Sequence, residues 1–178
     1  MKNNTQKIVL AGLLCAIGIV IPMFSPIKVV LEPASFTLAS HVAVFIAMFL
    51  SPSIAVAVSL GTTLGFLLGG FPIVVVARAL THVVFAFLGA RILQAKPELI
   101  SSIPKALPFS LGIGLLHGVC EVLIVLPFYI NGSMAGYALD TLFLLVGIGS
   151  VIHSMVDFAL AQVVWLPVRK TLKTVSAH

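Results

Sequence analysis

The chain has 178 residues, of which 60% are hydrophobic and only 8% charged, and its formal net charge is +5. Soluble domains carry roughly 25% charged residues, so this composition excludes an ordinary water-soluble globular protein. The basic residues lie near the ends of apolar segments and not in one patch, so nucleic-acid binding is not expected. The apolar segments are hydrophobic on every side, which excludes the alternating strands of a transmembrane barrel.

The apolar segments, taken in chain order, predict six transmembrane helices separated by short breaks that contain Pro, Gly or polar residues. A span needs about 20 residues, or fewer where the bilayer thins, so even the short second segment qualifies. We therefore predict an all-α membrane protein with a single integral membrane domain over residues 1–178. The predicted spans are residues 7–24, 35–50, 54–68, 71–93, 105–129 and 139–168.

The placement of lysine and arginine predicts the orientation of these spans, because cytoplasmic connections carry the excess of basic residues. With a cytoplasmic N-terminus, Lys28 is the only basic residue on the outer side, whereas eight others fall on the inner side. The opposite orientation reverses that ratio. Both termini are therefore predicted to be cytoplasmic, and the connections at residues 25–34, 69–72 and 130–136 are predicted to face outward.

Arg78 is the only Asp, Glu, Lys or Arg between Pro33 and Ala90, and it lies well inside an apolar span. A guanidinium in hydrocarbon costs at least ~2.5–3.5 kcal/mol on insertion scales, so it should have a partner or a function. Two interpretations stay open. In one, Arg78 and Glu121 form a structural ion pair between the fourth and fifth spans. In the other, which we favour, Arg78 faces a pocket and receives the anionic group of a small solute.

Three predicted spans each carry two ionisable residues four positions apart, so each pair occupies one helix face. At ~1.5 Å of rise per residue, Arg78, Glu121 and His41 are predicted to converge in the outer leaflet. The remaining members fall deeper: His82, His117 and His153 near the midplane and Asp157 towards the inner side. The candidate substrate contacts are Arg78, Glu121, His41, His82, His117, Asn131 and Tyr129. For each histidine alone, an interhelical hydrogen bond to the backbone or to Ser or Thr is the more common explanation.

Catalytic and metal-binding motifs are not found in the sequence. It has no HExxH, no Gly-rich phosphate loop after a strand and no GxSxG elbow. The ionisable groups are predicted to spread over most of the bilayer, and Cys15 and Cys120 lie inside apolar runs. We therefore predict no metal site, no cofactor and no enzymatic activity.

The first span presents small residues four positions apart, at Gly12 and Ala16 and at Ala11 and Cys15. Faces of this kind let two transmembrane helices approach closely. The face formed by Gly12 and Ala16 is therefore predicted either to pack within the bundle or to dock onto another membrane subunit.

The length, the six spans, this first span and the binding candidates beneath outer loops together resemble the S components of energy-coupling factor (ECF) vitamin transporters. Residues 26–70 look like the loop-one to span-three region of that family. Its first-span signature is Ala-x-x-x-Ala, and this chain has Gly12-x-x-x-Ala16 at the matching place. The resemblance implies a multi-pass protein of the bacterial plasma membrane that binds a vitamin from outside. It also implies partners, namely a transmembrane coupling subunit and two cytoplasmic ATPases, so that ATP hydrolysis is not expected on this chain.

The substrate follows from the single cation in an otherwise apolar site. The chain looks most like the niacin-type S components, and a nicotinate carboxylate on Arg78 is the favoured hypothesis. Pantothenate, also a carboxylate, is the next candidate. A self-sufficient proton-coupled carrier, with the histidines and acids as a relay, is the alternative class of function, and a metal-dependent membrane enzyme is the third.

Overall fold

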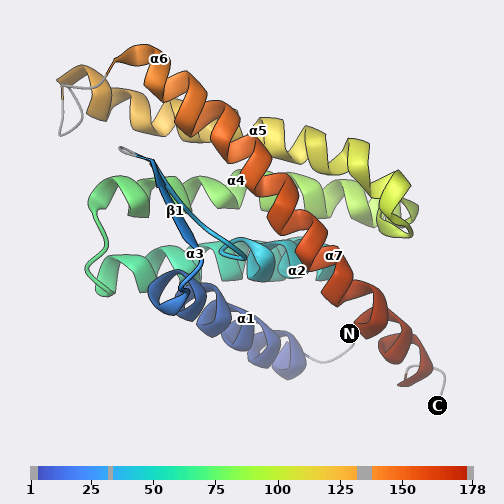
Figure 1. Ribbon diagram of the computed structural model, residues 1–178. Helices are drawn as coiled ribbons and strands as arrows, with labels where there is room; N and C mark the ends of the chain where they lie inside the picture. The colour runs from blue at the N-terminus through green and yellow to red at the C-terminus, as the bar shows by residue number, and fades with distance from the viewer. Residues whose placement is uncertain (1–3, 32–33, 132–137, 176–178) are drawn as a thin grey trace.

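The computed structural model describes residues 4–31, 34–131 and 138–175. Its helices are α1 (Asn4–Phe24), α2 (Val42–Leu50), α3 (Pro52–Leu68), α4 (Ile73–Ala95), η1 (Pro97–Ile100), α5 (Ile103–Asn131), α6 (Leu139–Thr141), the π-helical η2 (Leu142–Ile148) and α7 (Gly149–Val175). The last three follow one another directly and form one long rod (Figure 1). Between α1 and α2, β1 (Lys28–Leu31) and β2 (Ala34–Thr37) form an antiparallel hairpin.

Four helical segments are long and apolar enough to cross a membrane, namely Asn4–Phe24, Ile73–Ala95, Ile103–Ile130 and Leu139–Arg169. These coincide with four of the six predicted spans. The shorter apolar helix α3 has 17 residues and a length of about 26 Å, a little less than the ~30 Å hydrocarbon core. A count of six crossings and the cytoplasmic location of the termini stay predictions.

The predicted span at residues 35–50 is wrong in its first half. The structure places residues 34–37 in β2 and begins α2 only at Val42, so α2 has nine residues and a length of about 14 Å. The physical reason is that the backbone of residues 34–37 is paired with β1, from Lys28 opposite Thr37 to Leu31 opposite Ala34. An apolar composition does not distinguish this hairpin from the start of a span.

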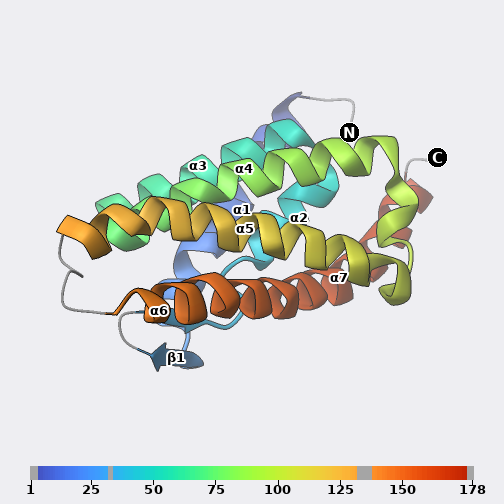
Figure 2. The ribbon, with the colours of Figure 1, turned by 90° about the horizontal axis from the view of Figure 1, so that it is seen from above.

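The long helices lie roughly side by side and alternate in direction, whereas α7 crosses the others diagonally (Figure 1). The start of α1 and the end of α7 lie at the same end of the bundle in both views (Figures 1 and 2). The hairpin lies towards the other end. Large exposed aliphatic side chains, such as Leu64, Leu115, Leu123 and Ile152, cover the outside of the bundle, as a lipid-facing surface requires.

The short helix α2 forms the centre of the bundle, because seven of its nine residues are buried. At its C-terminal end, an aromatic cluster fills the interior, with Phe45 and Phe49 packed against Phe158 at ring-centroid distances of 5.2 and 5.3 Å. Phe85 from α4 and Trp165 from α7 complete this cluster. The other end of α2, where the helix begins, is lined by polar side chains.

Helix α1 packs closely on α3 through one narrow face. A Cβ atom added at Gly18 would come 2.6 Å from Cγ2 of Thr62, so only glycine allows this approach. Cys15 lies against Gly61 on the same face. Gly12 and Ala16 point elsewhere and are exposed, and nothing lies within 4 Å of a Cβ built at Gly12. Within the described residues, the bundle therefore leaves this small-residue face uncovered.

Candidate functional site

A cavity of about 230 Å³ lies where α2 begins, between the hairpin, α1, α3 and α4. This volume is below the roughly 300–1,000 Å³ of pockets that hold drug-sized ligands, so the cavity suits a small solute. Its apolar walls are Pro22, Val44, Phe66, Phe71, Pro72, Val75 and Ala79, with Gly18 beside them. Its polar side chains are Lys28, Thr37, Ser40, His41, Thr62, Arg78, His82, Glu121 and His153.

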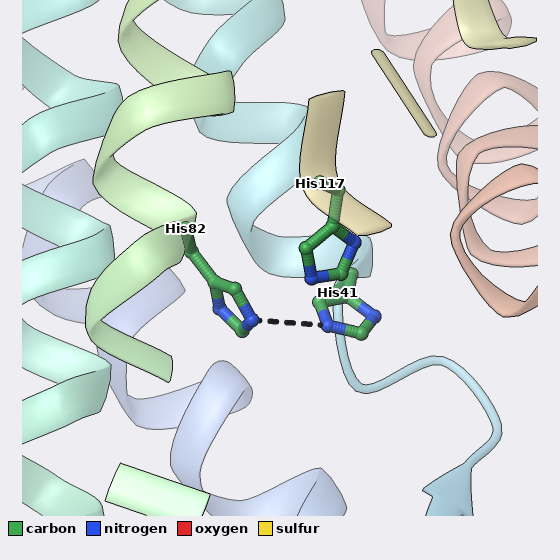
Figure 3. A group of neighbouring side chains, drawn as sticks. All are labelled: His41, His82 and His117. Carbon is green, nitrogen blue, oxygen red and sulfur yellow. Dashed lines mark hydrogen bonds between the residues drawn. The ribbon is translucent and has the colours of Figure 1, made fainter. Parts of the chain in front are cut away.

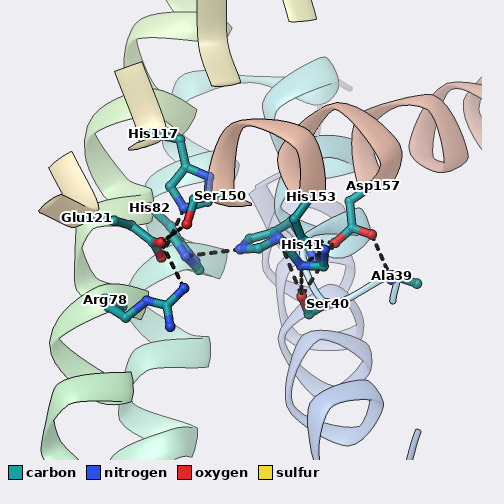
Figure 4. A network of polar contacts seen from close by, with 10 residues as sticks. All are labelled: Ala39, Ser40, His41, Arg78, His82, His117, Glu121, Ser150, His153 and Asp157. Atoms are coloured by element: carbon teal, nitrogen blue, oxygen red, sulfur yellow. Dashed lines mark hydrogen bonds and ion pairs between the residues drawn. The ribbon is translucent and has the colours of Figure 1, made fainter. Parts of the chain in front are cut away.

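The predicted pair of Arg78 and Glu121 is present and lies at the edge of this cavity (Figure 4). Nη2 of Arg78 donates to Oε2 of Glu121 at 2.9 Å, and the Glu121 side chain is only 2% exposed. Ser150 of α7 donates to the same carboxylate oxygen. Nε of Arg78 has no hydrogen-bond partner among the described residues. Arg78 thus combines the two interpretations left open by the sequence, since it joins two helices and also faces the cavity.

Asp157 of α7 is fully buried and organises the turn before α2 (Figure 4). Its carboxylate accepts the backbone N–H groups of Ala39 at 2.7 Å and His41 at 2.9 Å, and Nδ1 of His41 lies 3.0 Å away. Ala39 has a φ of 68°, a left-handed conformation that costs a residue with a Cβ roughly 1–2 kcal/mol. The bond from its N–H to Asp157 helps to hold that conformation.

The predicted separation in depth between Asp157 and His41 is therefore wrong. Depth was counted along straight, full-length spans, but α2 begins in the middle of the bundle and α7 crosses it diagonally (Figure 1). The same geometry brings His153 to the cavity, with its Nε2 3.0 Å from Oγ of Ser40.

The histidines also converge, contrary to their predicted separation by depth (Figure 3). The ring centroids of His41 and His82 are 4.6 Å apart, and that of His117 lies 4.9 Å from His41 and 5.1 Å from His82. Nε2 of His41 lies 3.2 Å from Nε2 of His82. The reason given against a metal site, a spread over most of the bilayer, is therefore wrong.

Two of the predicted contact residues, His117 and Tyr129, do not line the cavity. His117 lies behind it, fully buried, with Nε2 3.3 Å from Oε1 of Glu121. Tyr129 is buried in a separate apolar cluster that includes Val125 and Leu142. Asn131 ends α5, and its side chain and the connection at 132–137 lie outside the described residues.

No sequence pattern singles out Thr37, Ser40 and Thr62 on the cavity wall, or Ser150, which donates to Glu121. Serine and threonine are common in membrane helices, where they bond their own backbone, as Thr62 does to the carbonyl of Val58 at 2.9 Å. Ser40 and Ser150 are distinguished by their contacts with buried carboxylates, and Thr37 and Thr62 only by their place on the cavity wall.

Comparison with known proteins identifies the family. The chain is 40% identical over 163 residues to the niacin transporter NiaX of Lactococcus lactis subsp. cremoris, which covers 90% of this chain and 73% of NiaX. The chain belongs to the niacin-type S-component family. No family model and no solved structure matches it. The resemblance predicted from the sequence is thus confirmed by a relative that matches nearly the whole chain.

As a member of this family, the chain is a multi-pass protein of the cell membrane, in agreement with its long apolar helices. The match extends over nearly all of the bundle, and NiaX is described as a niacin transporter. A small-solute site within the bundle is what such a protein requires, and the cavity at the start of α2 is a candidate for it.

Proposed function

We propose that this protein binds niacin in the cavity at the start of α2 and takes it up as the S component of an ECF-type importer. Two findings together support the proposal: a niacin transporter is 40% identical to this chain, and the cavity is lined by Arg78. ATP hydrolysis would take place on partner ATPases, and this chain would perform no chemistry on its substrate.

The cavity has the two features that a nicotinate ion needs. The aromatic ring of nicotinate requires an apolar surface. Phe66 and Phe71, whose ring centroids are 4.7 Å apart, form such a surface together with Val75. The carboxylate of nicotinate requires a cation, and Arg78 is the only largely buried one on the cavity wall within the described residues. Charge-assisted hydrogen bonds from a guanidinium are among the strongest that a carboxylate can accept.

Substitution of Arg78 tests the carboxylate contact. Arg78→Ala should weaken niacin binding about 10- to 150-fold, the effect of losing a hydrogen bond worth about 1.5–3 kcal/mol to a charged group. Calorimetry on the purified protein measures it, with Arg91→Ala as the control, because Arg91 is an exposed arginine of the same helix outside this cavity. Unchanged affinity in Arg78→Ala would make the arginine purely structural.

The choice of ligand separates the substrates. Nicotinamide has the same ring without the negative charge, and it should bind far more weakly than niacin to the unaltered protein. Pantothenate has the carboxylate without the ring and tests whether the apolar wall selects a flat aromatic. Tighter binding of nicotinamide or pantothenate than of niacin would contradict the assignment of niacin.

The uncovered face of Gly12 and Ala16 is the proposed docking site for the coupling subunit. Both residues are exposed on α1, and small residues there would let a partner helix approach closely. Ala16→Phe should abolish co-purification with the coupling subunit and leave niacin binding by the isolated protein intact. Leu64→Phe, on the exposed face of α3, is the matched control and should retain the complex. Uptake by the protein alone in liposomes would instead favour a self-sufficient carrier.

A further inference from the structure

We propose that His41, His82 and His117 form a binding site for one divalent transition-metal ion of the Zn²⁺ type, at the floor of the cavity. The three side chains come from the start of α2, from α4 and from α5 (Figure 3). Imidazole nitrogen suits Zn²⁺, Ni²⁺, Cu²⁺ and Fe²⁺, whereas Mg²⁺ and Ca²⁺ prefer oxygen ligands.

The spacing of the nitrogen atoms is the first support. One ring nitrogen of each histidine lies within 4.8 Å of the other two. In a tetrahedral zinc site with Zn–N bonds of about 2.05 Å, the ligand nitrogens lie about 3.3 Å apart. The Nε2 atoms of His41 and His82 are already 3.2 Å apart. Small side-chain rotations of His117 complete the arrangement.

The carboxylate behind His41 is the second support. A metal-binding histidine commonly donates its other N–H to a carboxylate, which fixes the tautomer and the ring orientation. Asp157 lies 3.0 Å from Nδ1 of His41, so that Nε2 is left to face His82. Glu121 lies 3.3 Å from Nε2 of His117, the ring nitrogen that points towards His41 and His82 in Figure 3, so it does not hold that ring from behind.

His117 also lacks a partner for its ring nitrogens. Its side chain is fully buried, and neither nitrogen makes a hydrogen bond within the described part of the chain. A buried polar group without a partner costs roughly 1–3 kcal/mol, which a metal ion at Nε2 would offset.

A neighbouring group, His41 with His153 and Asp157, has similar spacing but is a weaker candidate. Its atoms are already satisfied by hydrogen bonds, since Nε2 of His153 lies 3.0 Å from Oγ of Ser40. Asp157 accepts bonds from the backbone of Ala39 and His41 as well. A metal ion there would have to displace those contacts, whereas at His117 it would supply a missing one.

Charge balance is the third support and connects the ion to the substrate, a step that rests on the proposed function. With neutral histidines, the largely buried groups Arg78, Glu121 and Asp157 sum to a charge of −1. An anionic carboxylate entering this site would leave two uncompensated negative charges in a low-dielectric interior, which is costly. A divalent ion brings the site to +1, and a carboxylate then neutralises it. His41 and His82 line the cavity, so the fourth ligand position of the ion would face the substrate.

The test uses the full chain, purified in detergent without a histidine tag and freed of metal with a chelator. Co²⁺ is titrated while visible absorption is recorded, because tetrahedral Co²⁺ absorbs strongly, and Zn²⁺ is then added as a competitor. We expect one equivalent to bind. Loss of a carboxylate that supports a metal ligand weakens metal binding about 10- to 100-fold. His82→Asn and His117→Asn each remove a ligand itself, so each should weaken Co²⁺ binding by more than that. His153→Asn, from the neighbouring group, is the matched control and should still bind one equivalent.

Three results would overturn the site. The first is that the unaltered protein binds no stoichiometric Co²⁺. The second is that Co²⁺ binding is unchanged in both His82→Asn and His117→Asn. The third is that Co²⁺ binding is lost only in His153→Asn. If a variant fails to fold, X-ray absorption on the Zn²⁺-loaded unaltered protein decides, since fewer than three imidazoles around the ion contradicts the proposal. Niacin is finally titrated into metal-free and Zn²⁺-loaded protein. Tighter binding with Zn²⁺ supports the charge argument and equal binding refutes it, whereas binding in neither state counts against the proposed function alone.

Discussion

The interior of the bundle is polar where α2 begins and aromatic where α2 ends, although α2, α4 and α7 line both regions. On α2, His41 is followed one turn later by Phe45, and on α4 His82 is followed by Phe85. On α7, the polar Asp157 stands directly before Phe158. One helical turn or less therefore separates a region that can bind an ion or a solute from one that is filled by packed rings.

The two regions differ in what their side chains leave unsatisfied. Aromatic rings need only close packing, and their edge-to-face contacts contribute about 0.5–1.5 kcal/mol each beyond their buried area. The polar side chains must each find a partner, and one that does not is a site for a ligand. The comparison implies that substitutions in the polar region change both stability and binding, whereas those in the aromatic region change stability alone.

The largest effect should come from Asp157→Ala, at the centre of the polar region. It leaves the backbone N–H groups of Ala39 and His41 and the Nδ1 of His41 without their acceptor. Breaking a buried charged network of this kind costs about 3–5 kcal/mol in the free energy of unfolding. Thermal unfolding in detergent measures it, and Asp140→Asn, an exposed acid of α6, should be close to neutral. A small effect would mean that the turn before α2 holds without α7.

A smaller effect of a different kind is expected from Glu121→Gln. The change replaces the charged acceptor of Arg78 and of Ser150 by a neutral amide and should cost about 1.5–3 kcal/mol of stability. It also removes one negative charge beside the cavity and frees the guanidinium, so niacin should bind more tightly. Calorimetry and thermal unfolding on one sample measure both quantities. Weaker niacin binding would show that Glu121 itself contacts the substrate.

The smallest effect should come from Phe158→Leu, in the aromatic region. The substitution keeps an apolar side chain of related volume and should cost about 1 kcal/mol of stability. Niacin affinity should stay unchanged, which distinguishes this region from the polar one. Phe143→Leu, at an exposed position of η2, is the control for the loss of a ring. A clear change in niacin affinity would mean that packing below α2 determines the shape of the cavity.

The sequence was sufficient to predict the helix faces and the main ion pair. Residues four positions apart share a face because an α-helix turns every 3.6 residues, and in lipid a face with two ionisable groups must turn inward. Arg78 and Glu121 are each nearly alone in their surroundings, so their pairing followed from the cost of a charge in hydrocarbon. The family resemblance followed from the pattern of spans and from Gly12 and Ala16.

Depth and long-range contacts were beyond a reading of the sequence. The hairpin depends on pairing between Lys28–Leu31 and Ala34–Thr37, and each of these segments alone resembles an apolar connection or a span. The convergence of His41 with Asp157 depends in turn on where the hairpin ends and on the tilt of α7. Neither quantity is encoded by local composition, so the grouping of the histidines could not be predicted.

The shortness of α2 has a consequence for the size of the solute that such a bundle can bind. Helix α2 has nine residues, seven fewer than the predicted span of 16, which corresponds to about 10 Å of helix, and the cavity lies at this shortened end. The long helices form the walls of the bundle, and the position at which α2 begins determines the depth of the cavity. Lengthening or shortening the segment 25–41 is therefore expected to change the size of the cavity without changing the lipid-facing surface or the uncovered face of α1. We expect variation in this one connection to alter which solute the same helix bundle binds.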